Sequence, residues 1–276
     1  MAGTTTSPAT APAQRVIGPW MAIALVMGNM IGSGIFLIPA SLAPYGGVAL
    51  AGWLVSAAGA TMLALMFARL GRLYPAAGGL YAYTRVAFGD LAGFLIGWGY
   101  WISTWASEAA LAVAFVGYLD PFVPSLVRSK PAAAGIAIAM VWLLTAVNVV
   151  GVRAAGRFQV ITTALKILPL LVIGIAGLFA LNTAHFATAA HGVGPFLSGA
   201  TAAATLTLFA FLGLECATIP AGSIENPDRT IPRATIVGTL LTAVLYIVGT
   251  VGSILRGVRR RLGGDGTDIR TSRRHE

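Results

Sequence analysis

Long apolar runs separated by short polar connectors dominate this sequence. Residues 16–68 contain no charged side chain, and only the turn at 44–47 interrupts their run. A bilayer requires roughly 20 apolar residues for each helix, so this stretch alone holds two spans. Over the whole chain the same pattern predicts seven transmembrane helices, at about 18–42, 48–69, 91–119, 132–150, 158–181, 197–222 and 234–255.

Two of the predicted helices carry glycine and proline where a membrane helix should be continuous. Gly32 precedes Pro39 by seven residues, and Gly213 precedes Pro220 by the same interval, at an offset of 181 residues. An unpaired backbone group in hydrocarbon costs several kcal/mol, so an unwound turn is tolerated only beside a cavity or a ligand. Paired interrupted helices predict a transporter site built from an internal repeat. Close helix packing is the alternative use of these glycines.

An interrupted helix offers both unpaired N–H groups and unpaired carbonyl groups to a ligand. The N–H groups of Ser33, Gly34 and Ile35 begin the second half-helix and are expected to face an anion. The carbonyls that end the first half are expected to face a cation. Since an amino acid carries both charges on one carbon, the first break favours an amino acid as the ligand.

Three ionisable residues lie within the predicted spans, where charges are costly and usually mark ion or substrate paths. The first is Glu108, which follows Tyr100 and Thr104 at intervals of four residues, so the three share one helical face. That face is suited to holding a cationic side chain or relaying a proton. A position near the outer membrane interface is the alternative for Glu108.

The other two are Lys166 in the fifth span and Glu215 in the second break. The ammonium of Lys166 is expected to take the place of a bound sodium ion and tie an unwound helix to its neighbour. The carboxylate of Glu215 is expected to load and release a proton as the site opens to either side. The alternatives are a Lys166 that snorkels to the cytoplasmic interface and a Glu215 that caps a half-helix.

Composition and charge place the chain in a membrane. With 57% hydrophobic and 10% charged residues, it has too little polar surface for a soluble globule. Two basic residues lie near the spans on one side of the predicted membrane and eight on the other, which predicts a plasma (inner) membrane protein with a cytoplasmic N-terminus. The basic loops favour contact with anionic lipid, whereas a charge of +9 spread in this way indicates no nucleic-acid partner.

The two ends of the chain differ from its apolar centre. Residues 1–15 are polar, lack a basic n-region and are expected to form a disordered cytoplasmic tail rather than a signal peptide. Residues 256–276 hold seven of the 18 basic residues, and after seven spans they would lie outside, against the charge bias. We therefore expect a basic tail foreign to the 16–255 transporter core. A native tail behind a re-entrant seventh segment is the alternative.

The predicted spans lack catalytic and metal-binding constellations. They contain no Ser/His/Asp set, histidine cluster or pair of aspartates, so an enzyme is not expected. His185 and His191 share a loop without a further ligand, so neither a metal nor a cofactor is expected. The single cysteine, Cys216, excludes an intrachain disulfide.

Three ordered motifs resemble the amino acid–polyamine–organocation permeases, most closely the arginine/agmatine antiporter branch. They are GNMIGSGIFLIP at 28–39, PAAGGLYAY at 75–83 and ENPDRTIP at 225–232. The resemblance implies an all-α membrane protein with a LeuT-like fold, in which twelve spans form two inverted five-helix repeats and work by alternating access. The second motif lies on the predicted cytoplasmic side, where its proline, glycines and aromatic residues favour a short re-entrant or interfacial hinge, with a plain loop as the alternative.

Carried onto this chain, the resemblance implies roles for individual backbone groups. Ser33 and Gly34 would bind the substrate carboxylate, and the Met30 carbonyl would take the amino group. Leu212 would supply a further carbonyl. Phe209 falls where the antiporter has a tryptophan that covers the substrate.

The same comparison implies roles for four side chains. Glu108 stands where the antiporter has an asparagine that meets the guanidinium, and a carboxylate there would favour a cationic side chain or serve coupling. Tyr100 and Glu215 match residues of gating and proton response. Lys166 resembles the fifth-span lysine of sodium-independent relatives.

Seven predicted spans of twelve indicate a chain truncated after the seventh span, which we expect not to transport unaided. The leading interpretation is a secondary carrier of amino acids, including cationic ones, or of polyamines. The alternative is a membrane fragment that regulates or partners a full-length permease. The expected partners are an amino acid or amine substrate, membrane lipid and, for symport rather than exchange, protons. A homodimer is left open.

Overall fold

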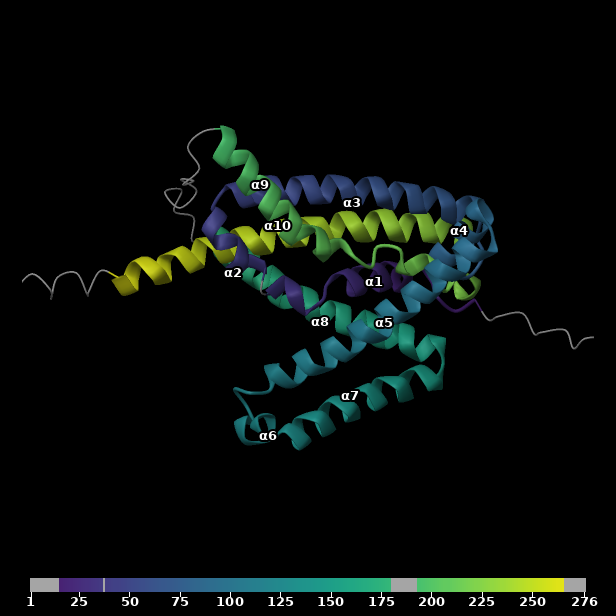
Figure 1. The fold of residues 1–276 in the computed structure, drawn as a ribbon, viewed down its shortest axis with the longest axis horizontal. Helices are drawn as coiled ribbons and strands as arrows, with labels where there is room; N and C mark the ends of the chain where they lie inside the picture. The colour runs from purple at the N-terminus through teal and green to yellow at the C-terminus, as the bar shows by residue number, and fades with distance from the viewer. Residues whose placement is uncertain (1–14, 37, 180–192, 266–276) are drawn as a thin grey trace, which may run out of the picture.

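Helices make up nearly all of the described chain (Figure 1). The structure, a computed structural model, describes residues 15–36, 38–179 and 193–265, so residues 1–14 and 266–276 and the loop with His185 and His191 lie outside it. The elements are α1 (Pro19–Met30), η1 (Ser33–Phe36), α2 (Ile38–Leu42), η2 (Ala43–Tyr45), α3 (Val48–Leu73), α4 (Leu80–Phe88), α5 (Asp90–Tyr118), α6 (Pro124–Arg128), α7 (Lys130–Val150), α8 (Val152–Leu178), α9 (Val193–Leu208), η4 (Phe209–Phe211), η5 (Cys216–Thr218), η6 (Ala221–Ser223) and α10 (Pro227–Asp265).

Several of these helices have the length and composition of membrane spans. Among the described residues there are five: Val48–Leu73, Lys130–Val150, Val152–Gly177, Gly194–Thr218 and Pro227–Gly252. The first predicted span is divided, which leaves Pro19–Met30 as a shorter apolar helix. The third predicted span forms α5, whose 29 residues include enough tryptophan, serine and threonine to keep it out of the apolar set.

The core lies between α1, α3, α8, α9 and α10. Trp53 of α3 and Tyr246 of α10 are both fully buried, and the centroids of their rings lie 5.2 Å apart. Small residues allow the helices to approach closely, since a Cβ added to Gly52 of α3 would lie 2.5 Å from the Cβ of Ala203 in α9. Such small-residue crossings are typical of helices packed in a membrane.

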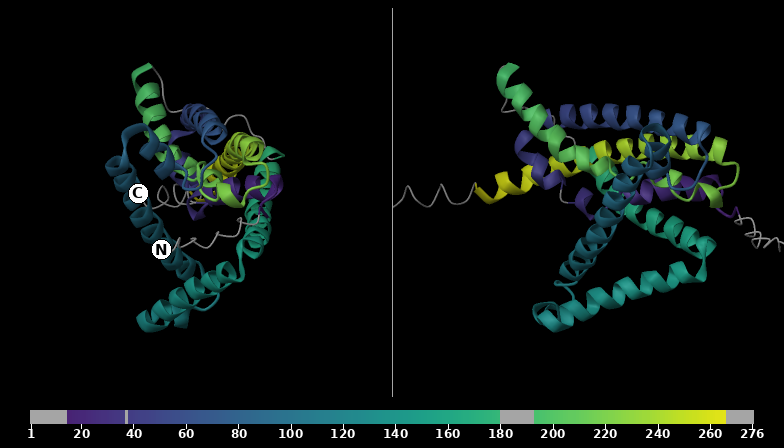
Figure 2. Two further views of the ribbon diagram at one scale, coloured as in Figure 1. Left: turned by 90° about the vertical axis from the view of Figure 1, so that its right-hand side faces the viewer. Right: turned by 45° about the vertical axis from the view of Figure 1, so that its right-hand side comes forward.

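A hairpin of α5 and α7 extends away from this core, as Figure 1 and both views of Figure 2 show. The structure buries no side chain of α7, and large apolar residues such as Trp142, Leu143 and Val149 are exposed on it. Apolar surface of this extent marks a face that meets lipid or another protein.

The first predicted break is confirmed. Helix α1 ends at Met30, and Ile31 follows with φ −77° and ψ 83°, outside the helical region. The chain resumes as the short helices η1 and α2. The run 18–42 is therefore an interrupted helix rather than one continuous span.

The second break is also present, but it is longer than expected. Helix α9 ends at Leu208, Leu212 is extended with ψ 141°, and Gly213 has φ 100°. Residues 209–223 then form three short 3₁₀ turns in place of the half-helix that we expected up to residue 222.

Helix α10 begins earlier and ends later than the predicted span 234–255. It starts at Pro227, because proline suits the first position of a helix and the carbonyl of Asn226 accepts the N–H groups of Arg229 and Thr230. Its backbone continues to Asp265, past the residue at which the predicted span ends.

Candidate functional site

The two interrupted segments lie against each other. Gly213 has a positive φ of 100°, and a Cβ added there would be 3.0 Å from the Cβ and 3.1 Å from the carbonyl carbon of Asn29. Only glycine combines this backbone conformation with so close an approach. The segments 28–39 and 208–220 therefore meet, as a site built from two interrupted helices requires.

Two side chains from other helices hold the carbonyls that the first break leaves free. The ammonium of Lys166 in α8 donates to the Gly28 carbonyl at 3.0 Å. The hydroxyl of Tyr246 in α10 donates to the Met30 carbonyl at 2.6 Å. The last carbonyls of a helix lack intrahelical partners, and these two bonds supply side-chain donors there, while the Met30 carbonyl also accepts from the Gly32 N–H at 2.9 Å. Lys166 thus points into the bundle, and the alternative in which it snorkels to the interface is wrong.

Close packing of α1 on α8 brings Lys166 within reach of Gly28. A Cβ added to Gly28 would collide with the side chains of Gln159 and Thr163. Thr163 also donates its hydroxyl to the Ala24 carbonyl, one turn earlier in α1, at 3.1 Å. A side chain at position 28 would therefore displace the side chains of Gln159 and Thr163.

The start of η1 presents backbone rather than side chains. Ser33 and Gly34 open the element, where the first N–H groups of a helix have no intrahelical acceptor. A Cβ added to Gly34 would meet nothing within 4 Å, so the space beside this backbone is open. The side chains of Met30 and Ile35 are buried in the core and hold the two sides of the break in place.

Tyr100 and Glu215, predicted for gating, are brought together. The Tyr100 hydroxyl in α5 donates to Oε1 of Glu215 at 3.4 Å. Thr218 donates both its N–H and its hydroxyl to the Glu215 carbonyl, at 2.8 and 2.7 Å. Glu215 occupies the N-cap position of η5 without a side-chain cap bond, so the alternative in which its carboxylate caps a half-helix is wrong.

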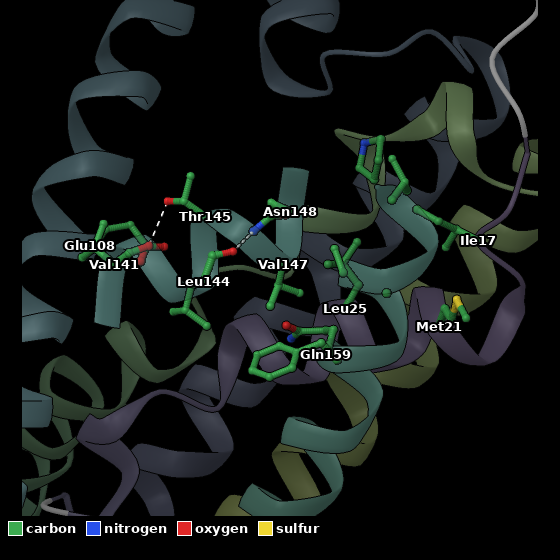
Figure 3. A pocket seen from close by; sticks show the side chains of 15 residues that line it. Ile17, Met21, Leu25, Glu108, Val141, Leu144, Thr145, Val147, Asn148 and Gln159 are labelled. Carbon is green, nitrogen blue, oxygen red and sulfur yellow. Dashed lines mark hydrogen bonds between the residues drawn. The ribbon is translucent and has the colours of Figure 1, made fainter. Parts of the chain in front are cut away.

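Four other predicted site residues are exposed. Phe209 is 70% exposed and Leu212 is 65% exposed, and the Thr104 hydroxyl donates to the Tyr100 carbonyl of its own helix. Glu108 lines a cavity of about 530 Å³ bounded by α1, α5, α7 and α8 (Figure 3). Within the described ranges no hydrogen bond joins these four side chains to the breaks.

A comparison with known families decides what kind of protein this is. The sequence profile described as amino acid permease matches residues 17–255. The chain belongs to the amino acid permease family. With five apolar helices and two interrupted segments, it is an all-α, multi-pass membrane protein with the LeuT-like fold of that family.

Similar proteins in this family are named as antiporters and transporters. The chain is 37% identical to the cadaverine/lysine antiporter of Escherichia coli (strain K12), with 86% of the chain and 53% of that protein covered. It is 35% identical to the putrescine transporter PotE of the same strain, with 85% and 53% covered. It is 34% identical to the putative arginine/ornithine antiporter of Bacillus subtilis (strain 168), with 85% and 56% covered. The chain thus spans about half the length of these curated relatives.

Sequence reasoning missed Tyr246. Position 246 reads as one more residue of an apolar run, yet its ring packs on Trp53 and on Phe211 of the second break, while its hydroxyl binds Met30 of the first. Tyr246 therefore touches both interrupted segments. A tyrosine within a membrane span is the only signal that pointed to it, since a buried phenol needs a partner.

The 75–83 motif also contacts the second break. The Gly78 N–H donates to the Ile219 carbonyl at 3.2 Å, and Tyr83 of α4 is hydrogen-bonded to Thr218. Burial raises the pKa of Tyr83, so its hydroxyl stays protonated to a higher pH than in water. The segment is thus tied to the site rather than a free loop between α3 and α4.

Replacing Tyr246 by phenylalanine is expected to cost about 0.5–1.5 kcal/mol of stability, because the ring stays while the Met30 carbonyl loses the Tyr246 hydroxyl and keeps only the Gly32 N–H. Thermal unfolding of the purified chain in detergent measures the change. Tyr74→Phe is the control, since Tyr74 is exposed on the connector after α3. Equal unfolding temperatures for the two variants would contradict a structural role for the bond.

Proposed function

We propose that the chain binds amino acids or their decarboxylated amines for secondary active transport by alternating access. The observation that carries this proposal is the meeting of two interrupted helices, with Lys166 and Tyr246 fixing the freed carbonyls of Gly28 and Met30. Backbone of this kind is tolerated in a membrane where it serves a ligand.

The substrate would be held mainly by the first break. Its carboxylate would meet the N–H groups at the start of η1, from Ser33 to Ile35, and its amino group would meet the Met30 carbonyl. The Met30 carbonyl already accepts from the Tyr246 hydroxyl at 2.6 Å and from the Gly32 N–H at 2.9 Å, so a substrate ammonium would have to displace one of these two donors. The exposed residues Phe209, Leu212 and Thr104 would face the bound molecule from the second break and from α5.

We infer that the substrates are cationic amino acids or polyamines. The printed names of the similar proteins include cadaverine, lysine, putrescine, arginine and ornithine. Glu108 supports the same preference, because within the described residues its carboxylate has no ion-pair partner and would attract a cationic group.

Coupling would involve Lys166, Tyr100 and Glu215. Lys166 joins α8 to the first break as a bound cation would, and Tyr100 joins α5 to the second break through Glu215. A proton on Glu215 would weaken the attraction that draws Tyr100 to it. We place the chain in the plasma membrane with its N-terminus in the cytoplasm, as the bias of eight basic residues against two supports.

Binding of radiolabelled cadaverine, lysine and leucine, followed by scintillation proximity, tests this proposal. We expect saturable binding of cadaverine and lysine, and a loss of about tenfold in their affinity in Glu108→Gln with leucine unaffected, since a charged hydrogen bond is removed. Asp120→Asn, which removes a carboxylate just beyond the end of α5, is the control. Equal effects on cationic and neutral ligands would contradict the role of Glu108, and absence of all saturable binding would contradict the function.

The exposed apolar faces of α5 and α7 favour a second candidate function. These faces could pack on a full-length permease, for which this chain would be a regulatory partner without transport of its own. Co-purification with such a permease would support this function. Saturable, stereoselective uptake by liposomes that contain this chain alone would exclude it.

A further inference from the structure

The cavity between α1, α5, α7 and α8 has the size of a small-molecule site. Its volume of about 530 Å³ lies within the usual range of roughly 300–1,000 Å³ for ligand pockets. Met21 and Leu25 lie four residues apart on one face of α1, Ile17 lies ahead of that helix, and α7 contributes Leu144. The walls are therefore mainly aliphatic.

The lining of the cavity also includes a charged side chain. Glu108 is the single charged residue that lines the cavity. In Figure 3 it lies at one side, Ile17 and Met21 lie at the other, and Leu144 and Leu25 lie between them. The cavity is thus charged at one end and apolar at the other, with the amide side chains of Asn148 and Gln159 between the two ends.

The polar neighbours on α7 leave the Glu108 carboxylate unmatched. Thr145 donates to the Val141 carbonyl at 2.8 Å, and Asn148 donates to the Leu144 carbonyl at 3.0 Å, so both bond within their own helix. In the part of the chain that the structure describes, no hydrogen bond or ion pair reaches Glu108. A carboxylate near low-dielectric walls is favoured by a cationic partner.

We propose that this cavity binds a primary alkylammonium, with the ammonium at Glu108 and the alkyl tail along Leu25 and Met21. The tail would pack on the aliphatic part of the cavity, while the ammonium would gain a charge-assisted hydrogen bond. A diamine or an amino acid fits this cavity poorly, because its second charged group would lie on the apolar walls. This ligand class therefore differs from the proposed transport substrates, although both would meet Glu108.

Direct binding of radiolabelled n-octylammonium to the full chain in nanodiscs, corrected with empty nanodiscs, tests the proposal. We expect saturable binding that neither n-octanol nor octanoate displaces. Glu108→Gln is expected to lower the affinity about tenfold, the loss of one hydrogen bond to a charged group.

A matched pair of substitutions on α7 separates this site from the substrate site. Leu144→Trp fills the aliphatic part of the cavity and is expected to lower octylammonium affinity at least about tenfold, with cadaverine binding unchanged. Leu143→Trp places the same ring on the exposed face of α7 and is expected to change neither.

Three results would overturn the proposal. They are displacement of octylammonium by n-octanol, equal affinities in Leu144→Trp and Leu143→Trp, and an unchanged affinity in Glu108→Gln. Size-exclusion profiles show whether each variant is folded. A chain that binds no cadaverine can still bind octylammonium, so failure of the proposed function and failure of this site are distinguishable.

Discussion

A Gly213→Val variant is expected to lose about 3 kcal/mol of stability or more. Position 213 has φ 100°, a conformation that costs a residue with a β-carbon about 1–2 kcal/mol. The new Cβ would also press on the Cβ and backbone of Asn29 at 3.0–3.1 Å, and overpacking of this kind typically costs about 1–3 kcal/mol. The two effects are expected to add, because one strains the backbone of residue 213 and the other strains its contact with Asn29.

Thermal unfolding in detergent and the monodisperse yield measure this loss. Gly222→Val is the matched control, since Gly222 lies in the same irregular segment and a Cβ there would meet nothing within 4 Å. A Gly213→Val chain as stable as Gly222→Val would mean that the two breaks do not pack as described. The larger loss at 213 would show that contact between the breaks is part of the folded core.

The positions of the breaks could be predicted because their causes are local. Glycine and proline within an apolar run disrupt helix pairing wherever the chain folds, so Gly32 with Pro39 and Gly213 with Pro220 marked both sites. The shape of the second break could not be predicted in the same way. Its 3₁₀ turns end in backbone bonds to distant segments, such as that between the Ile219 carbonyl and Gly78, and periodicity carries no information about such partners.

The candidate site was predictable to a similar extent. Lys166 and Glu215 stood out because charge inside a span is costly, and both make bonds at the breaks. Tyr246 could not be distinguished from its apolar neighbours, since its role depends on α10 lying beside Met30, 216 residues earlier. The exposure of Phe209 and Leu212 was equally hidden, because it depends on which helices cover them.

Backbone hydrogen bonds join the segment before α1 to the segment before α10. The N–H groups of Val16 and Ile17 donate to the Ser223 carbonyl at 2.9 and 3.0 Å, and Glu225 donates back to Ile17 at 3.0 Å. Both helices that follow carry contacts of the first break. If the chain works by the proposed alternating access, opening between these two segments would have to break these hydrogen bonds, and they would therefore oppose it.

A Lys166→Met variant is expected to keep its fold and to lose about ten- to a hundredfold in cadaverine and lysine affinity. Two effects on stability oppose each other, because methionine removes a partly buried ammonium from the bundle but also frees the Gly28 carbonyl. No second effect offsets the loss of affinity. Gly28 lies two residues before Met30, and without the bond from Lys166 to its carbonyl the first break is no longer held against α8. The estimate corresponds to a hydrogen bond to a charged group of about 1.5–3 kcal/mol.

The matched control for that variant is Leu165→Met, which introduces the same side chain on the exposed neighbouring position. Scintillation proximity binding reports affinity, and thermal unfolding reports the fold. Lys166→Arg should recover part of the binding, because a guanidinium also donates to a carbonyl but places its planar donors differently. Binding by Lys166→Met that equals binding by Leu165→Met would mean that the bond to Gly28 holds α1 against α8 without shaping the substrate site.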